Sequence, residues 1–238
     1  MQVGLLLLAA GSGKRFGSEI PKQYLEVAGF PLIYHTLKSL AAEPRISVVQ
    51  PVIAAGDTRF AEVAAMGVWP FTLLPPVIGG EERSMSMCHG LAALPLEIDM
   101  VAVHDAARAL PSAALLADVL DVADFHGAAV PGLAVHDTIK RINANGQVVE
   151  TPDRKLLMAV QTPQVGKRLW FEQALKLEAD RLHLHTDDAS VLEAAGYPVY
   201  ISKGDINNRK VTTPEDMLWL EDLLLKQALQ EKRIGDMQ

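Results

Sequence analysis

The chain has 238 residues, of which 49% are hydrophobic and 21% charged, and its formal net charge at pH 7 is -7. This composition excludes a disordered chain, and the negative charge argues against a nucleic acid as partner, because nucleic-acid binders present basic surfaces. The single cysteine, Cys88, excludes an intrachain disulfide and favours a reducing, cytoplasmic compartment. We expect no membrane segment, since the uncharged stretch 63–80 contains three prolines and three glycines.

Short apolar runs alternate with helical patterns along most of the chain. The predicted strands are Val3–Leu8, Ser47–Ala54, Phe71–Ile78, Met100–His104 and Ala128–Pro131. The predicted helices between them are Pro31–Ala42, Arg83–Leu94 and Ser112–Phe125. Such an alternation predicts an α/β domain whose mixed, mainly parallel sheet carries helices on both faces.

Residues 134–156 interrupt this alternation. Val135–Ile142 and Gln147–Glu150 are extended runs, and the turn between them ends in Asn145-Gly146. Asn-Gly is a hairpin signal because both residues accept positive φ. An exposed two-stranded hairpin is marginally stable alone. We therefore expect a protruding β-hairpin arm, inserted into a single domain of residues 1–238, that packs against a second copy of the chain.

The last third of the chain returns to the α/β pattern. A helix is predicted to begin near Asp187, with Thr186 or Asp187 as its cap, and residues 197–202 are predicted to form a strand. The last helix is predicted to begin at Thr213 and Pro214, with acidic residues in its first turn, and to run through residue 225.

The loop after the first strand is the first candidate site. Residues 8–17 read Leu-Ala-Ala-Gly-Ser-Gly-Lys-Arg-Phe-Gly, so small residues are followed at once by two basic ones, a pattern that suits a bound phosphate. The loop fails as a P-loop, because Leu8 stands at the first glycine position and Arg15 replaces the hydroxyl residue. It is a weak dinucleotide fingerprint, because Phe16 occupies the third glycine position. Taken alone, the loop fits a ligand site and a tight turn equally well.

Further short blocks follow this loop in a characteristic order. They are residues 21–24 (Pro-Lys-Gln-Tyr), Gly79–Ser86, Val103–Arg108, Asp137–Lys140, Gln161–Gln164, Thr186–Ala189 and Lys210–Thr212. The ordered set resembles the sugar-phosphate nucleotidyltransferases, and most closely the 2-C-methyl-D-erythritol 4-phosphate cytidylyltransferase family, over essentially the whole chain. The resemblance implies a Rossmann-like fold and transfer of the cytidylyl group of CTP to 2-C-methyl-D-erythritol 4-phosphate, with release of pyrophosphate, in the non-mevalonate synthesis of isoprenoid precursors.

The resemblance also assigns candidate site residues. It implies four catalytic cations, which are Arg15, Lys22, Arg154 and Lys210. It implies nucleotide binding by Ala9, Ala10, Gly11, Gly13, Gly80, Arg83, Ser86, Asp105 and Ala106, and binding of the second substrate by Arg108, Asp137, Thr138 and Thr162. Asp105 is expected to hold Mg²⁺ beside the triphosphate. In the family, Arg154 reaches the neighbouring subunit's site, so the arm is expected to complete a shared site in a homodimer.

Several alternatives remain open at this stage. Asp105 also suits a helix or turn cap, and the basic residues of the first loop and of the arm also suit solvated surfaces. The chain departs from the family at Ala109, where proline is usual, and at Arg209, where isoleucine is usual. Rival functions are a ribitol-5-phosphate cytidylyltransferase, a purine-using relative, a nucleotide-dependent dehydrogenase and a non-catalytic nucleotide-binding module.

Overall fold

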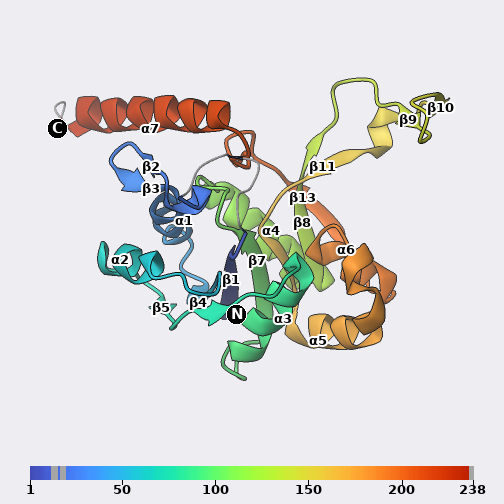
Figure 1. Cartoon of the computed structure of the whole chain (residues 1–238), viewed down its shortest axis with the longest axis horizontal. Helices are drawn as coiled ribbons and strands as arrows, with labels where there is room; N and C mark the ends of the chain where they lie inside the picture. Colours follow the sequence, from blue (N-terminus) through green and yellow to red (C-terminus); the bar gives the residue numbers. More distant parts are fainter. Residues whose placement is uncertain (12–15, 17–19, 236–238) are drawn as a thin grey trace.

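The central element of the computed structural model is a mixed sheet (Figure 1), and the structure describes residues 1–11, 16 and 20–235. Within these residues nine strands form the sheet: β1 Val3–Ala9, β4 Ile46–Ile53, β5 Thr72–Leu73, β6 Val77–Ile78, β7 Met100–Asp105, β8 Ala128–Ala134, β11 Met158–Val160, β12 Gln164–Lys167 and β13 Tyr200–Lys203. Their order is β11-β8-β12-β7-β1-β4-β5, with β13 on β8 and β6 on β4. β1, β4 and β7 are mutually parallel, whereas β12 lies antiparallel between β7 and β8.

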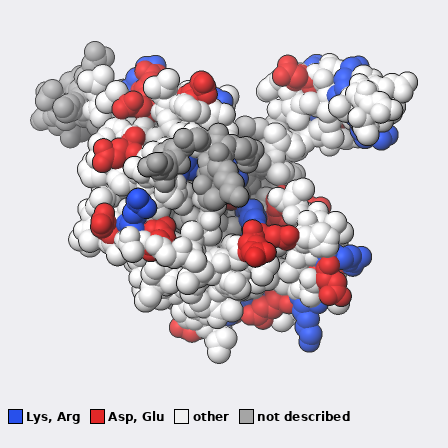
Figure 2. All heavy atoms as spheres, viewed as in Figure 1, with Lys and Arg blue, Asp and Glu red and all other residues white. Residues whose placement is uncertain are grey.

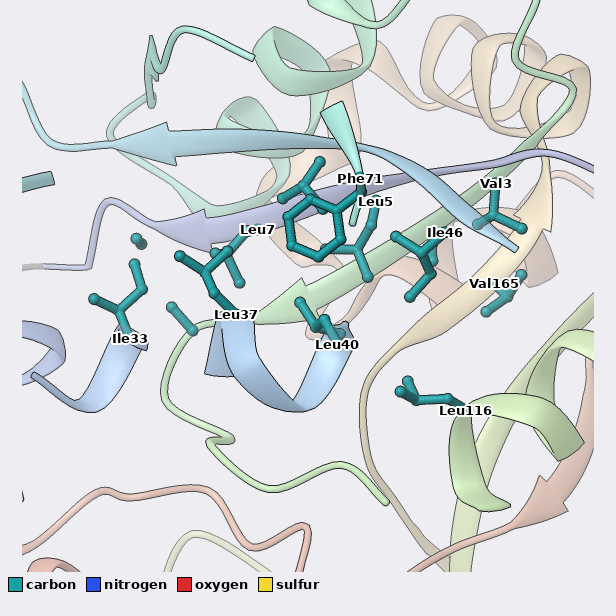
Figure 3. Packing of buried hydrophobic residues seen from close by; sticks show 14 of the residues in the cluster. Val3, Leu5, Leu7, Ile33, Leu37, Leu40, Ile46, Phe71, Leu116 and Val165 are labelled. Carbon is teal, nitrogen blue, oxygen red and sulfur yellow. The ribbon is translucent and has the colours of Figure 1, made fainter. Parts of the chain in front are cut away.

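Helices cover both faces of this sheet. The first face carries α1 (Leu32–Leu40), α2 (Arg59–Ala65) and α4 (Ala113–His126), and the second carries α3 (Arg83–Ala93), α5 (Arg168–Leu177) and α6 (Asp188–Ala194). Alternate residues of β1 divide between the two layers: Leu5 and Leu7 pack with α1 (Figure 3), and Leu6 packs with α3. A strand buried on both sides is apolar throughout, so the uninterrupted apolar run in β1 follows directly from this layering. The predicted fold class is confirmed.

The helix boundaries follow local capping chemistry. Ser112 caps α4 by accepting a hydrogen bond from the Leu115 amide at 3.3 Å, and Gly127, with φ of 98°, ends it in the left-handed conformation. Asp187 caps α6 by accepting from the Ser190 amide at 3.0 Å, which decides between the two predicted caps. Pro31 is the N-cap of α1 instead of its first helical residue, so that helix begins one residue later than predicted.

Two predicted extended segments are shorter than expected. The predicted strand Phe71–Ile78 is two strands, β5 and β6, because Pro75 and Pro76 lack the amide donors that a continuous ladder requires. In the arm only β9 (Arg141–Ile142) and β10 (Val148–Glu150) pair, and residues 135–140 are not strand. The prediction missed α2, α5, β11 and β12.

The arm projects from the body of the molecule (Figure 1). It continues from β10 through the 3₁₀ helix η3 (Arg154–Leu156) into β11. Its surface carries acidic and basic side chains (Figure 2), among them the ion pair of Arg141 with Glu150 at 2.7 Å. Large apolar side chains are also exposed along it, at Ile142, Val148, Val149 and Leu156.

The remaining described elements lie outside the central sheet. They are η2 (Lys22–Tyr24), β2 (Glu26–Val27), β3 (Phe30–Pro31), η4 (Ala179–Leu184) and the long helix α7 (Pro214–Gly235). α7 starts at Pro214, as predicted, and is longer than predicted. Among the described residues, no helix combines the length and apolar character that crossing a membrane requires.

Candidate active site

A cavity of about 380 Å³ opens where β1 and β7 end and α3 begins. The carboxyl ends of parallel strands are the usual ligand-binding edge of an open α/β sheet. The cavity is lined by Leu8, Ala9, Ala10, Gly11, Lys22, Gln23, Gly80, Glu81, Glu82, Arg83, Ser86, Asp105, Ala106, Ala107 and Lys210. Segments distant in the sequence therefore meet at one place.

Polar contacts with neighbouring segments hold the carboxyl end of β1. The buried Gln23 donates to the Ala9 carbonyl at 2.6 Å, and the Ala106 amide donates to the Leu8 carbonyl at 3.0 Å. Lys22 donates from Nζ to the Val211 carbonyl at 2.9 Å, which places its charge at the cavity wall. The predicted site residues Gly13 and Arg15 lie outside the described residues.

Asp105, the last residue of β7, lies between two cations. Its Oδ1 accepts from Arg83 Nε at 3.2 Å and Nη2 at 3.1 Å, and its Oδ2 accepts from Lys210 Nζ at 2.7 Å. Burial alone would raise the pKa of Asp105, but the charges of Arg83 and Lys210 outweigh it and hold that pKa well below its usual range. Asp105 is therefore an anion at neutral pH. Its carboxylate pairs with two cations and does not cap a helix, which was the alternative that the sequence left open.

Arg83 has a second carboxylate partner, which the sequence reasoning missed. Its Nη1 pairs with Oδ1 of Asp188 at 2.6 Å, and Asp188 is only 1% exposed. Asp188 was part of a family block but received no role, since nothing in the local sequence shows that the first residue of α6 meets the first residue of α3. The result is a row of side chains, Asp188, Arg83, Asp105 and Lys210, in which acidic and basic residues alternate.

His104 connects the end of β7 to the block that contains Thr162. Its side chain is 0% exposed, and burial lowers its pKa from 6.5 to about 4, so the ring is neutral. Nε2 lies 3.0 Å from the Arg108 carbonyl, which can only accept, so we assign the ring proton to Nε2. Nδ1 then accepts from the Thr162 hydroxyl at 3.0 Å, and that hydroxyl accepts from the Asp105 amide at 3.1 Å. Thr162 is thus held against Asp105, and this role of His104 was not predicted.

The segment Gly204–Thr213, here called the Lys210 strap, crosses the same edge of the sheet. Gln161 donates to the Asp205 carbonyl at 2.8 Å, and Asn208 donates to the Thr162 carbonyl at 2.7 Å. Arg108 donates from Nη1 to the Asn208 carbonyl at 2.8 Å. Arg108 Nε is buried and has no hydrogen-bond partner among the described residues, and burial lowers the pKa of this guanidinium. A half-buried cation whose Nε donor is buried and open is suited to an anionic ligand.

Close packing shapes the opposite wall, around Gly79 and Gly80. The Gly80 amide donates to Ser86 Oγ at 3.1 Å. A Cβ at Gly79 would lie 2.5 Å from Cβ of Ala10 and 2.6 Å from Ser86 Oγ, and a Cβ at Gly80 would lie 2.3 Å from Cβ of Met85. Both positions therefore require glycine for steric reasons.

The structure gathers most of the predicted site residues but leaves three apart. Arg83, Asp105, Lys22 and Lys210 line the cavity, as do Ala9, Ala10 and Gly11 of the predicted first-loop positions. Thr162 and Arg108 hydrogen-bond to groups around it. Asp137, Thr138 and Arg154 are exposed on the arm and do not line the cavity, and Arg154 donates to the His136 carbonyl.

The chain is similar to curated proteins over most of its length. Residues 3–226 match the protein family described as 2-C-methyl-D-erythritol 4-phosphate cytidylyltransferase (IspD). A protein of that name from Alkaliphilus metalliredigens is 38% identical, with coverage of 91% of this chain and 90% of the relative. A chloroplastic protein of that name from Oryza sativa subsp. japonica is 37% identical, covering 93% and 74%. A bifunctional enzyme IspD/IspF from Rhodopseudomonas palustris is 41% identical to this chain, and the match covers 92% of this chain and 55% of that relative.

Solved structures give the same result. The 2-C-methyl-D-erythritol 4-phosphate cytidylyltransferase from Thermus thermophilus has a TM-score of 0.75 and 28% identity, with coverage of 94% of this chain and 99% of the other. The 4-diphosphocytidyl-2C-methyl-D-erythritol synthase from Anaerococcus prevotii has a TM-score of 0.82 at 24% identity, covering 94% and 98%, and this likeness supports the fold alone. The cavity is lined by residues from the blocks on which the resemblance rested. Together with the family match and the curated relatives, this shows that the chain belongs to the 2-C-methyl-D-erythritol 4-phosphate cytidylyltransferase family.

Proposed function

We propose that this chain transfers the cytidylyl group of CTP to 2-C-methyl-D-erythritol 4-phosphate and releases pyrophosphate. The observation that carries the proposal is the arrangement of Asp105 between Arg83 and Lys210, in a cavity formed by the family's blocks. The product, 4-diphosphocytidyl-2-C-methyl-D-erythritol, is an isoprenoid precursor of the non-mevalonate pathway. The isolated thiol of Cys88 agrees with a cytoplasmic location.

The reaction makes electrostatic demands on the protein. The nucleophile is a phosphate oxygen that is already ionised at neutral pH, so no general base is required. Negative charge grows on the α-phosphoryl oxygens and on the leaving pyrophosphate, and fixed cations and amides stabilise it. In our proposal Lys22 and Arg15 stabilise the triphosphate, with backbone amides of Ala10, Gly11 and Gly13. Gly80 and Ser86 form the narrow wall that accepts the cytosine ring.

The residues present fit a magnesium ion. Asp105 supplies a carboxylate that lines the cavity, and Mg²⁺ in phosphate-transfer sites is commonly bound by one or two carboxylates with substrate phosphates and water. Among the described residues no group of three or more His, Cys, Asp or Glu side chains is placed to hold a metal ion, so a dedicated protein cage is not part of the proposal. When bound, the ion would neutralise phosphate charge beside Asp105. Arg83 and Lys210 then keep the carboxylate oriented toward the cavity.

The second substrate brings a phosphate of its own. The half-buried Arg108, with its open Nε donor, and Lys210 are cations close to Thr162 and Asp105, and we propose that they bind this phosphate. We further propose that Asp137, Thr138 and Arg154 complete the pocket from the arm of a second copy. The exposed apolar residues of the arm, Ile142 and Leu156 among them, support such a homodimer, because large apolar patches on a surface commonly mark interfaces.

Pyrophosphate release tests the acceptor directly. The purified protein receives CTP and Mg²⁺ with 2-C-methyl-D-erythritol 4-phosphate or with ribitol 5-phosphate in separate reactions. We expect release with the methylerythritol compound. Release with ribitol phosphate alone would change the acceptor while leaving the cytidylyl transfer intact. Lack of release with both, from a folded protein that binds CTP, would overturn the proposed reaction. Replacing CTP by GTP tests the purine alternative, and Asp105→Asn serves as the site control.

A further inference from the structure

The Lys210 strap is fastened on its outer side by the first turn of α7. Asp216, which is 2% exposed, accepts at Oδ2 from the Thr212 amide at 2.9 Å, the Thr212 hydroxyl at 2.9 Å and the Thr213 amide at 3.0 Å. Its other oxygen, Oδ1, pairs with Nη2 of Arg209 at 2.6 Å. One buried carboxylate thus holds the chain on both sides of Lys210.

Arg209 contributes two contacts to this fastening. Besides its ion pair with Asp216, its guanidinium lies over the Trp219 ring, 5.7 Å from the ring centroid, in a cation–π contact. The neighbouring Lys210 pairs instead with Asp105, at the end of β7. Arg209 is therefore directed to α7 while Lys210 is directed to the cavity. The position at which the sequence was expected to depart from the family pattern therefore contacts α7 and does not enter the cavity.

On its inner side, facing the cavity, the strap is held by hydrogen bonds of Val211, the residue after Lys210. The Val211 amide donates to the Ala107 carbonyl at 2.8 Å, and the Val211 carbonyl accepts from Lys22 at 2.9 Å. The strap has no regular secondary structure over residues 207–213, so side-chain contacts must fix its path. If the contacts with Asp216 were lost, the strap would shift, and both Lys210 and the Val211 carbonyl that holds Lys22 would move with it.

We infer that Asp216 and Arg209 are positioning residues, which clamp the Lys210 strap to α7 and thereby fix Lys210 and Lys22 in the active site. The inference rests on the proposed function of the cavity. Neither residue lines the cavity, so both act through other groups. Misplacement of a reacting group by about 1 Å lowers turnover on the order of 10²-fold. The clamp therefore contributes to the rate as well as to helix capping.

Kinetics of matched variants separate these two contributions. Asp216→Asn keeps the size of the side chain but turns an NH₂ group toward either the threonine amides or Arg209. We expect kcat to fall by roughly 10- to 100-fold, measured well below the melting temperature of each variant. Arg209→Met should lose roughly 3- to 10-fold, and Arg209→Lys should recover part of that loss because it restores the charge. Asp222→Asn breaks an exposed ion pair with Lys226 on the same helix and should leave kcat and KM unchanged.

A second measurement reports on Lys210 without any turnover. The lysines are labelled by reductive ¹³C-methylation, and the NMR signal of Lys210 is assigned with Lys210→Arg. In the wild type we expect a distinct, shifted signal from the ion-paired amine, and in Asp216→Asn a signal close to those of solvent-exposed lysines. Normal kcat and KM with a lowered melting temperature in Asp216→Asn would overturn the clamp, leaving a helix cap only.

The two readouts also keep the clamp apart from the proposed reaction. A wild type that is inactive with both acceptors contradicts the proposed function, and the Lys210 signal then decides on the clamp. An unchanged signal in Asp216→Asn would contradict the clamp whatever the activity. An active wild type with unimpaired variants contradicts the clamp alone.

Discussion

The buried His104 shows how a residue without a substrate contact shapes the site. Its ring joins the Thr162 hydroxyl to the Arg108 carbonyl, and the same hydroxyl receives the Asp105 amide. In the native state its pKa is lowered from 6.5 to about 4 by burial. Because the native state resists protonation, the unfolded state binds the proton first as the pH falls. His104 therefore stabilises the fold above pH 6.5, and this contribution is lost progressively between pH 6.5 and pH 4.

The pH dependence of unfolding tests this interpretation. When the pH is lowered from about 7.5 to about 5, the titration of His104 should reduce the unfolding free energy of the wild type by about 2 kcal/mol. His104→Gln, which keeps a donor for the Arg108 carbonyl, should lose less over the same range by about that amount. Urea unfolding of both proteins at the two pH values provides the comparison. Carboxylates titrate in both proteins, so their contribution to the unfolding free energy cancels in the difference. An equal loss of unfolding free energy in both proteins would show that the native fold does not lower the pKa of His104.

The glycine wall of the cavity leads to a prediction about CTP. Gly79→Ala introduces a Cβ that would overlap Ala10 and Ser86, so the hydroxyl of Ser86 must move. We expect the KM for CTP to rise about tenfold or more, which corresponds to a loss of about 1.4 kcal/mol or more of binding free energy when the hydroxyl of Ser86 is displaced. The KM for the acceptor should change less. Steady-state kinetics with each substrate varied in turn measure both, and a larger effect on the acceptor would contradict the assignment of this wall to the nucleotide.

At the scale of elements, Gln164 links β12 to α6. Its Nε2 donates to Asp187 Oδ2 at 2.8 Å, and its Oε1 accepts from the Ala189 amide at 2.8 Å. Gln164→Leu leaves these two groups without partners, and we expect the unfolding free energy to fall by about 2 kcal/mol or more. Because α6 carries Asp188, the partner of Arg83, the KM for CTP should also rise. Chemical denaturation with parallel kinetics measures both effects, and stability equal to wild type would argue that water replaces the amide.

The sequence predicted elements where one local rule decided the outcome. Apolar runs with turn signals indicated β1, β4, β7 and β8, and capping residues indicated the starts of α6 and α7. The prediction was wrong where a rule competed with another: Phe71–Ile78 is apolar in most positions, but Pro75 and Pro76 divide it. β12 was missed because four residues with only one large apolar side chain show no pattern of their own.

The site was predictable to the extent that its residues lie in recognisable blocks. Asp105 and Lys210 were identified as site residues, and they make a 2.7 Å ion pair across 105 positions of sequence. The partnership of Arg83 with Asp188 was not predictable, because it depends on the packing of α6 against the sheet. Arg209 was recognised only as a departure, since its partner Asp216 is defined by where the strap meets α7.

At the scale of the whole molecule, the arm and the cavity belong to separate parts of one chain. Arg154 is exposed on the arm, whereas Lys210 lines the cavity. In a symmetric dimer with exchanged arms, each site would combine the cavity of one subunit with the arm of the other.

Mixing two inactive variants tests this shared site. Arg154→Met and Lys210→Met should each be nearly inactive alone. After co-refolding, half of the dimers are mixed, and each mixed dimer has one intact site, so about a quarter of wild-type activity should return. Lys210→Met mixed with Asp105→Asn, two changes in the same cavity, serves as the negative control. No recovery in a dimer verified by sedimentation would mean that Arg154 acts within its own subunit.

The proline pair that divides β5 from β6 has a further consequence for the molecule in concentrated solution. These strands cover the outer side of β4 with only two residues each, Thr72–Leu73 and Val77–Ile78. A strand of another molecule that approached this edge would find two-residue stretches separated by positions without amide hydrogens. The edge therefore provides no template for continued sheet growth between molecules, and the apolar residues 71–78 can close the core without promoting aggregation.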